Sequence, residues 1–254
     1  MDAGRKIAVA GATGRVGLHL VDVLQARGFD VVPMSRSSGV DVVSGDGLAE
    51  ALTGVECVVD AASGSLSEQE AATEFFTTAA RNLQQAGEQA GVERMVVVSI
   101  IGCDRFTTGY NAAKVAHEQA MLSGPIPVRI LRAAQFHEFV PAIVDWGRQG
   151  DVSYVRELRT QLVAARTVAE ALADMATNPG VPEVPIPEIA GPREENSVEM
   201  ARLLVTRRGD SVRIEGVSDP DDPATKLYES GALLPGPHAI LAGPTFEQWL
   251  DSTT

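Results

Sequence analysis

Short runs of apolar, often β-branched residues alternate with longer amphipathic stretches from the N-terminus to about Glu138. Such short runs indicate strands, and apolar residues spaced three and four apart indicate helices. Strands are expected at residues 7–10, 30–35, 40–43, 56–61, 94–100 and 128–131. Helices are expected at residues 15–27, 48–53 and 114–122, with a long one that ends near residue 90 and is frayed or interrupted near Gly87.

The run at residues 94–100 is apolar almost throughout, which indicates a strand buried on both faces, as in a parallel sheet. Strands that alternate with helices are joined by right-handed crossovers, and these place helices on both faces of the sheet. The predicted fold class is therefore α/β, with a doubly wound parallel sheet.

The alternation ends beyond Glu138, where proline and glycine become frequent. Strand-like segments at residues 152–155, 161–164, 185–189 and 211–217 are mixed there with helical patterns at 167–177, 198–207 and 246–252. We therefore expect a core over residues 1–137 and a smaller α+β lobe over residues 138–254. The lobe is expected to pack on the core rather than to fold independently.

A glycine-rich turn follows the first expected strand and opens the first expected helix. It reads Gly11-Ala12-Thr13-Gly14-Arg15-Val16-Gly17. Glycines at such points allow a sharp turn and a close approach of the backbone to a pyrophosphate, and the helix N-terminus offers N–H groups and a positive dipole end to the anion. In this strand–turn–helix context the pattern predicts a dinucleotide site, with a tight turn that binds no ligand as the alternative.

The end of the second expected strand indicates which dinucleotide binds. NAD sites usually place an acidic residue there for the ribose 2′-hydroxyl. This chain instead has Ser35-Arg36-Ser37. A guanidinium can form paired hydrogen bonds with a 2′-phosphate, and the two hydroxyls add donors. The segment favours NADP(H), with Arg15 as a second cation; the alternative is that Arg36 is a solvated loop residue.

Tyr110 and Lys114 form a Tyr-x-x-x-Lys pattern, and Ser99 lies at the end of the strand that precedes it. Side chains four residues apart share one face of a helix. A lysine there is expected to lower the pKa of the tyrosine and to hold the nicotinamide ribose. Such a tyrosine can exchange the proton that accompanies hydride transfer at a carbonyl, and Ser99 would orient the same oxygen. Two surface residues on a helix are the alternative.

Composition limits the classes of partner. The formal net charge is −13 and no Lys/Arg-rich run offsets it, which argues against binding to nucleic acid. No apolar run is long enough to span a bilayer and no signal sequence is recognisable, so a cytoplasmic protein is expected. Cys57 and Cys103 lie far apart, which fits a reducing compartment, and Cys57 is expected in the core.

None of the histidines has the spacing of a metal-ligand pair, so no metal is expected. They are His19, His117, His137 and His238. His19 is interpreted as a packing or surface residue and His117 as a solvated one. His137 is the best functional candidate, at the rim of a pocket, where it would bind a substrate oxygen or act as an alternative acid.

The chain resembles the short-chain dehydrogenase/reductase superfamily, in particular its atypical, NmrA-like branch. The resemblance rests on the glycine turn, on Val96-Val97-Val98-Ser99-Ile100-Ile101-Gly102, on Tyr110-x-x-x-Lys114, and on Ile130-Leu131-Arg132-Ala133-Ala134-Gln135-Phe136-His137-Glu138-Phe139. It implies a Rossmann-type core that binds NADP(H), a small C-terminal substrate lobe and a nicotinamide cleft between them. It also implies cofactor contacts from Asp46, Gly47, Ala61, Ala62 and Ser63, and a substrate pocket shaped by Gln135, Phe136 and His137.

Three functions are compatible with these features. The favoured one is an NADPH-dependent oxidoreductase that reduces a small carbonyl, enone or quinone, with Tyr110 as proton donor, Lys114 as ribose anchor and Ser99 as orienting group. A non-catalytic NADP(H)-binding redox sensor of the NmrA-like type would not need a tuned tyrosine. An epimerase or dehydratase that holds NAD is disfavoured by the missing acid near Arg36. A small-molecule substrate is expected, without nucleic acid or membrane partners, in a monomer or homodimer.

Overall fold

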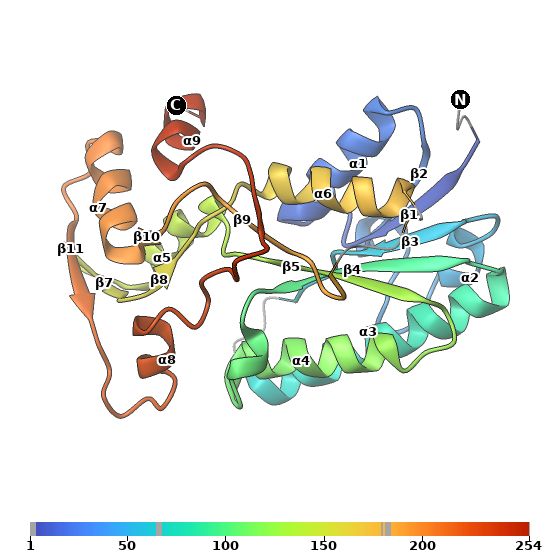
Figure 1. Ribbon diagram of the computed structural model, residues 1–254, viewed down its shortest axis with the longest axis horizontal. Coiled ribbons are helices and arrows are strands. Elements are labelled where there is room, and N and C mark those ends of the chain that lie inside the picture. Colours follow the sequence, from blue (N-terminus) through green and yellow to red (C-terminus); the bar gives the residue numbers. More distant parts are fainter. Residues whose placement is uncertain (1–3, 65–67, 179, 181–183, 254) are drawn as a thin grey trace. The chain divides into compact units, whose positions relative to one another are not determined.

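The computed structural model describes residues 4–64, 68–178, 180 and 184–253. The chain forms two compact units, each built from several segments (Figure 1). Unit 1 comprises residues 1–99, 107–132 and 168–187, and unit 2 comprises residues 100–106, 133–167 and 188–254. The main sheet has seven strands in the order β12-β9-β5-β4-β3-β1-β2.

The elements of the first half follow the predicted alternation. They are β1 (Lys6–Ala10), α1 (Arg15–Ala26), β2 (Asp30–Met34), the 3-10 helix η1 (Arg36–Ser38), α2 (Leu48–Ala51), β3 (Cys57–Asp60), α3 (Gln69–Ala90), β4 (Arg94–Ile100), η2 (Cys103–Arg105), α4 (Gly109–Leu122) and β5 (Val128–Ala133). Strand β1 lies between β2 and β3 and pairs in parallel with both, and β3 pairs in parallel with β4. These pairings confirm the predicted doubly wound α/β class.

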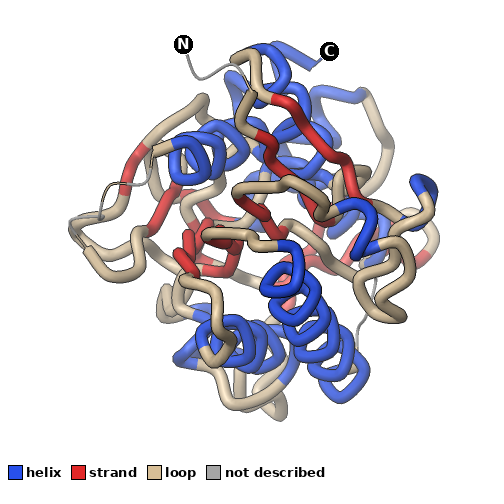
Figure 2. The backbone as a smooth tube through the Cα atoms, turned by 90° about the vertical axis from the view of Figure 1, so that its right-hand side faces the viewer, coloured by secondary structure: helices blue, strands red, loops and turns tan. Residues whose placement is uncertain are grey.

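Helices cover both faces of the strands in unit 1. Helices α3 and α4 lie side by side on one face, with α1 and α6 (Ala165–Thr177) on the other (Figure 1). Figure 2, which faces this unit, shows helices on two sides of its strands. The layering follows from β3 and the middle of β4, which are buried on both faces as the apolar run at 94–100 predicted.

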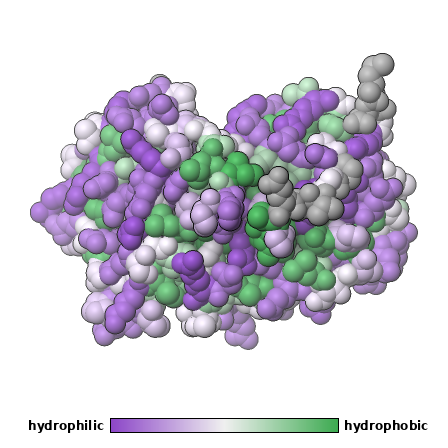
Figure 3. Space-filling view, in the orientation of Figure 1, coloured by the Kyte–Doolittle hydropathy of each residue, from purple (hydrophilic) through white to green (hydrophobic). Residues whose placement is uncertain are grey.

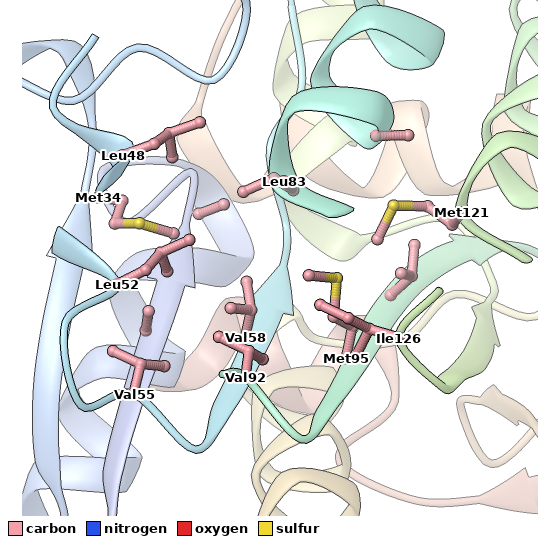
Figure 4. Close-up of a cluster of buried hydrophobic side chains, with 14 of the residues drawn as sticks. Met34, Leu48, Leu52, Val55, Val58, Leu83, Val92, Met95, Met121 and Ile126 are labelled. Carbon is pink, nitrogen blue, oxygen red and sulfur yellow. The ribbon is translucent and has the colours of Figure 1, made fainter. Parts of the chain in front are cut away.

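An apolar cluster fills the space between the sheet and helices α2, α3 and α4 (Figure 4). Its fully buried members include Met34 from β2, Leu52 after α2, Leu83 from α3, Met95 from β4 and Met121 from α4. Since successive strand residues point to opposite faces, Ala8 and Ala10 of β1 belong to this cluster while Ile7 and Val9 do not. The thioethers suit such a layer because unbranched side chains adapt to irregular gaps.

Two predictions about local structure in unit 1 were wrong. Residues 40–43 do not form a strand but a turn, in which the Asp41 carboxylate accepts hydrogen bonds from the N–H groups of Val43 and Ser44. Such side-chain bonds to the backbone compete with strand pairing. Helix α3 is continuous through Gly87, which is buried, and a Cβ there would lie 2.8 Å from the side chains of Ile126 and Met95. Gly87 thus permits close packing and does not break the helix.

Arginines at the amino ends of the strands hold the C-terminal end of α6. Arg5 donates to the Thr177 carbonyl (2.8 Å), Arg94 to that of Ala176 (2.7 Å), and Arg129 to those of Met175 (3.0 Å) and Asn178 (2.7 Å). The last carbonyls of a helix have no partner within it and form the negative end of its dipole. The three guanidinium groups satisfy both needs, which fixes α6 on the sheet.

Unit 2 contains shorter elements. They are η3 (His137–Phe139), α5 (Val140–Trp146), β6 (Arg148–Gln149), β7 (Val152–Arg156), β8 (Arg159–Thr160), β9 (Glu188–Ala190), β10 (Glu195–Asn196), α7 (Ser197–Arg208), β11 (Arg213–Val217), α8 (Thr225–Glu229), β12 (Ile240–Leu241) and α9 (Phe246–Thr253).

Hydrophilic residues are spread over the visible face of the molecule (Figure 3), in keeping with the charge of −13. In the part of the chain that the structure describes, no helix is long and apolar enough to cross a membrane.

Candidate functional site

The glycine turn joins the carboxyl end of β1 to the N-terminus of α1, as predicted. The N–H groups of Gly11 and Ala12 donate to the Met34 carbonyl at the end of β2 (3.0 and 3.2 Å), and that of Gly14 donates to the Gly11 carbonyl (2.9 Å). These bonds leave the first turn of α1, which starts at Arg15, as the part of the motif that can offer N–H groups to an anion.

The three glycines of the turn have different reasons to be glycine. Gly11 has a positive φ of 74°, and a Cβ on it would lie 2.6 Å from the Ala61 carbonyl oxygen. A Cβ on Gly17 would overlap the Gly11 carbonyl. Gly14 is exposed, has ordinary extended backbone angles, and a Cβ would meet only the Gly11 oxygen, at 3.1 Å. The protein's own packing therefore requires Gly11 and Gly17 but explains Gly14 poorly.

The residues expected on the adenosine side lie together in two adjoining turns. Arg36 and Ser37 are exposed in η1, and the Ser35 hydroxyl is within hydrogen-bond distance of that of Ser37 (2.9 Å). Gly47 lies against the next residue after η1, because a Cβ on it would overlap the Gly39 carbonyl. Asp46 accepts a hydrogen bond from the Ser44 hydroxyl (2.8 Å). The structure thus brings the predicted segments 35–37 and 46–47 to one edge of the sheet, beyond β2.

Residues after β3 connect the glycine turn to the predicted catalytic helix. Ala61 lies beside Gly11, and Ser63 reaches Tyr110 on α4, with their hydroxyl oxygens 2.9 Å apart. The carboxyl ends of β1, β2, β3 and β4 thereby place all the predicted residues of unit 1 along one edge of a parallel sheet. Ligands of open α/β sheets bind at this edge.

Tyr110 differs from its prediction in its electrostatics and in its partner. Burial raises the pKa of its phenol, and the hydrogen bond with Ser63 offsets this only in part. The expectation that Lys114 lowers this pKa was therefore wrong. The hydroxyl that contacts Tyr110 is that of Ser63, whereas Ser99 is buried at the end of β4 with 3% of its surface exposed.

Lys114 is buried, and its ammonium forms hydrogen bonds within the protein. Its Nζ donates to the Val98 carbonyl (2.9 Å) and lies 2.8 Å from Nδ1 of His117. Nε2 of His117 lies 2.9 Å from Oδ2 of Asp60, whose Oδ1 accepts from the N–H of Ala62 (2.9 Å). The exposed fraction of the residue surface is 5% for Lys114 and 1% each for Asp60 and His117.

The charges in this group are set by burial and by neighbours. Burial alone raises the pKa of Asp60, but the hydrogen bonds from His117 and Ala62 and the nearby positive charge outweigh it and hold this pKa below its ordinary value. Burial and the Lys114 charge lower the pKa of His117, against the opposing effect of Asp60. These shifts favour a carboxylate at Asp60 and a neutral imidazole at His117, beside the positive charge of Lys114.

Sequence reasoning missed three residues of this arrangement. His117 was interpreted as solvated, which was wrong, and Asp60 and Phe76 were not singled out. The Phe76 ring stacks on His117 (centroids 4.8 Å apart), meets Tyr110 edge-on (5.6 Å) and lies 4.5 Å from Nζ of Lys114. One signal was available, because His117 follows Lys114 by one helical turn and Asp60 ends a fully buried strand.

The three residues expected in a substrate pocket lie in unit 2. Gln135 accepts a hydrogen bond from the Thr160 hydroxyl (2.5 Å), and Phe136 stacks on Phe139. His137 is completely buried, and its Nε2 lies 3.1 Å from the Pro244 carbonyl. Burial lowers its pKa to about 4. His137 is thus a neutral packed residue, and its expected place at a pocket rim, as an alternative acid, was wrong.

A family model described as NAD(P)H-binding matches residues 11–179, which is well over half of the chain. The chain belongs to this NAD(P)H-binding family. The matched region begins at Gly11 and includes the whole row of residues from the glycine turn to Lys114. No curated protein matches the sequence.

Solved structures share the fold over nearly the whole chain. A dTDP-4-dehydrorhamnose reductase from Bacillus anthracis, in complex with NADP, is 15% identical with a TM-score of 0.76, covering 98% of each chain. A short-chain dehydrogenase/reductase superfamily protein from Agrobacterium tumefaciens, with bound NAD, is 16% identical (TM-score 0.69; 98% of this chain and 95% of that one). An NADPH-dependent quinone oxidoreductase from Escherichia coli is 18% identical (TM-score 0.66; 97% and 99%). These matches confirm the Rossmann-type fold that the resemblance implied.

The residues of the NAD(P)H-binding protein fit a dinucleotide. Gly14 leaves space beside the first turn of α1 that a side chain would fill, and this turn carries N–H donors and the positive end of the helix dipole. A pyrophosphate requires both features. Within the described part of the chain, no group of three or more His, Cys, Asp or Glu residues is arranged to hold a metal ion.

The glycine turn yields the first prediction. Gly14→Ala should weaken NADPH binding at least about tenfold, or about 1.4 kcal/mol, because its methyl group occupies the space of the pyrophosphate. Its free energy of unfolding should stay close to that of the wild type, because the backbone is extended and the contact at 3.1 Å is slight. Gly17→Ala is the matched control and should lose about 1–3 kcal/mol of stability through overlap with Gly11. Calorimetric titration and urea unfolding measure the two effects, and equal effects in both variants would contradict the assignment.

The second prediction concerns His137 and pH. Its folded pKa of about 4 lies below the ordinary value of 6.5, so the unfolded state binds the proton first as pH falls. The stability from the neutral imidazole is full above pH about 6.5 and is lost toward pH about 4, by about 3 kcal/mol in all. Both tryptophans, Trp146 and Trp249, lie in unit 2, so urea unfolding followed by their fluorescence reports on it.

Two variants isolate this effect. His137→Gln can still donate to Pro244 but does not titrate, so its stability should depend less steeply on pH between 4 and 6.5. His238→Gln removes an exposed histidine of the same unit and should keep the wild-type slope. An unchanged slope in His137→Gln would show that His137 titrates normally in the folded state.

Proposed function

We propose that this NAD(P)H-binding protein is an NADPH-dependent oxidoreductase that reduces a small carbonyl, enone or quinone. The observation that carries the proposal is the place of the Tyr110 hydroxyl. It is held by Ser63 at 2.9 Å, on the same sheet edge as the glycine turn and on the helix that also carries Lys114. A protein that only bound the dinucleotide would not need a phenol held there.

The environment of Tyr110 suits proton donation. A raised pKa keeps the phenol protonated at neutral pH, which is the state needed to donate to a carbonyl oxygen. We assign the orienting role to Ser63, since its hydroxyl contacts Tyr110 and Ser99 is buried. We assign Lys114 to the ribose of the cofactor.

The proposed reaction is balanced by one hydride and one proton. The glycine turn and the loop after β2 would hold NADPH, which would supply a hydride for the electrophilic carbon of the substrate. Tyr110 donates its hydroxyl proton to the oxygen, so that a carbonyl becomes an alcohol, and the phenolate is then reprotonated from water. Ser63 holds the phenol oxygen in place for this transfer.

The preference for NADPH is assigned to the loop after β2. Arg36 is exposed in η1, where no carboxylate follows the strand to bind a 2′-hydroxyl. Its guanidinium and the hydroxyls of Ser35 and Ser37 are the groups that would hold a 2′-phosphate, with Asp46 and Gly47 in the adjoining turn.

Turnover tests the role of Tyr110. Oxidation of NADPH should be observed with at least one class among quinones, enones and aldehydes, and Tyr110→Phe should lower kcat by about 10²–10⁴-fold while NADPH affinity stays within about twofold. Comparison of Ser99→Ala with Ser63→Ala shows which serine orients the phenol. The larger decrease in kcat is expected in Ser63→Ala. Tight NADPH binding without turnover in every class would favour the redox sensor instead.

Cofactor selectivity tests the role of Arg36. Arg36→Ala should weaken NADPH binding by about 1.5–3 kcal/mol, the range for a hydrogen bond to a charged group, and leave NADH binding unchanged. Parallel titration of both nucleotides into both proteins measures this. Equal affinity of the wild type for NADPH and NADH would show that Arg36 does not bind the phosphate.

A further inference from the structure

We infer that Asp60 and His117 are positioning residues that hold the Lys114 ammonium in one orientation for the cofactor. This inference rests on the proposed role of Lys114 at the ribose. It goes beyond that role by naming the two buried residues through which the lysine is placed. Neither residue is proposed to touch cofactor or substrate.

The hydrogen-bond geometry determines the tautomer of His117. Asp60 is a carboxylate and can only accept, so Nε2 of His117, at 2.9 Å from Oδ2, must carry the hydrogen. Nδ1 faces the ammonium of Lys114 at 2.8 Å, and an ammonium can only donate. Nδ1 therefore presents its lone pair to Lys114. The orientation of the imidazole is fixed by an acceptor on one side and a donor on the other.

The same geometry fixes Lys114. Two of its three N–H bonds point to Nδ1 of His117 and to the Val98 carbonyl, which also fixes the direction of the third. These two acceptors come from α4 and β4, while Asp60 belongs to β3. The Phe76 ring stacks on the imidazole of His117 and lies against the ammonium, which adds packing contacts to the hydrogen bonds that hold both groups. A flexible side chain is thus ordered before the cofactor arrives, which lowers the entropic cost of binding.

The position of the proton excludes proton donation from His117 to Lys114. With its hydrogen on Nε2, the imidazole has none on Nδ1 to give to Lys114. A proton relay from Asp60 to Lys114 would require the opposite tautomer. The role that we infer for the pair is to hold the ammonium through geometry and charge.

The test compares NADPH affinity among substituted proteins. Lys114→Met gives the full loss of NADPH affinity that results from removing the lysine. His117→Leu should reproduce most of that loss, at least about tenfold in Kd, because a buried ammonium loses one of its acceptors. His117→Asn should recover much of the affinity, since its Oδ1 lies about where Nδ1 was and can accept from Lys114. The NADPH affinity of Asp60→Asn should fall between those of the leucine and asparagine variants of His117. Its amide carries no charge and has one acceptor oxygen for the two donors, the Ala62 N–H and Nε2 of His117.

Glu118→Gln is the matched control. It breaks a buried ion pair with Arg132 (2.8 Å) one residue along α4 and keeps the hydrogen bonds that join Lys114, His117 and Asp60. It should lower stability and leave NADPH affinity within about twofold. A purely structural role of His117 predicts instead that its leucine and asparagine variants are both destabilised and both bind NADPH like Glu118→Gln, which would overturn the inference.

Two further outcomes keep this inference separate from the proposed function. If Lys114→Met weakens binding and His117→Leu does not, the positioning role fails while the proposed function stands. If Lys114→Met binds NADPH like the wild type, the cofactor role of Lys114 fails and the positioning role falls with it. Nitrogen NMR of His117 in the wild-type protein is independent of binding: hydrogen on Nε2 is expected, and hydrogen on Nδ1 would overturn the inference.

Discussion

The burial of the Lys114 charge is the constraint around which the site in unit 1 is arranged. Removing an ammonium from water costs several kcal/mol, and a lone buried lysine would lose its proton instead. Here the charge is met by the Val98 carbonyl and the His117 imidazole, and the imidazole is in turn backed by the Asp60 carboxylate. Each partner comes from a different strand or helix. The carboxyl ends of β3 and β4 and the face of α4 must therefore be in register before the charge is tolerated.

The same constraint explains why small and aromatic residues occupy the spaces around these groups. Asp60 is fully buried, so its second oxygen also needs a donor, which the Ala62 N–H supplies in the turn that leads to Ser63. This turn is the one that approaches Gly11 so closely that a Cβ would not fit. Phe76 packs against the imidazole and the ammonium without adding polar atoms. The hydrogen bonds that satisfy a buried carboxylate thus also fix the loop that lies against the dinucleotide turn.

Sequence patterns predicted the elements that depend on local periodicity, and missed the features that depend on contacts between distant residues. The glycine turn, the buried strand at residues 94–100 and the helix with Tyr110 and Lys114 are visible as spacing. The turn at 40–43 was predicted as a strand because three of its four residues are valines, and Asp41 decided otherwise. The burial of His117 could be inferred only by combining its place one helical turn after Lys114 with Asp60, which is 57 residues away. His137 and Gly87 were misjudged for the same reason, as neither burial nor packing against another element shows in the residues beside them.

The pKa of Tyr110 bears on the role that we propose for its phenol. A lowered pKa, as the lysine four residues away had suggested, would favour a phenolate that removes a proton from an alcohol. The phenol is instead largely buried and hydrogen-bonded to a neutral serine, and Lys114 directs two of its N–H bonds to His117 and Val98. A raised pKa favours the protonated phenol, which can give its proton to an oxygen that gains a hydride. The hydrogen bonds of Lys114 to His117 and Val98 and the raised pKa of Tyr110 are therefore linked, and together they fit the proposed role of the phenol as a proton donor.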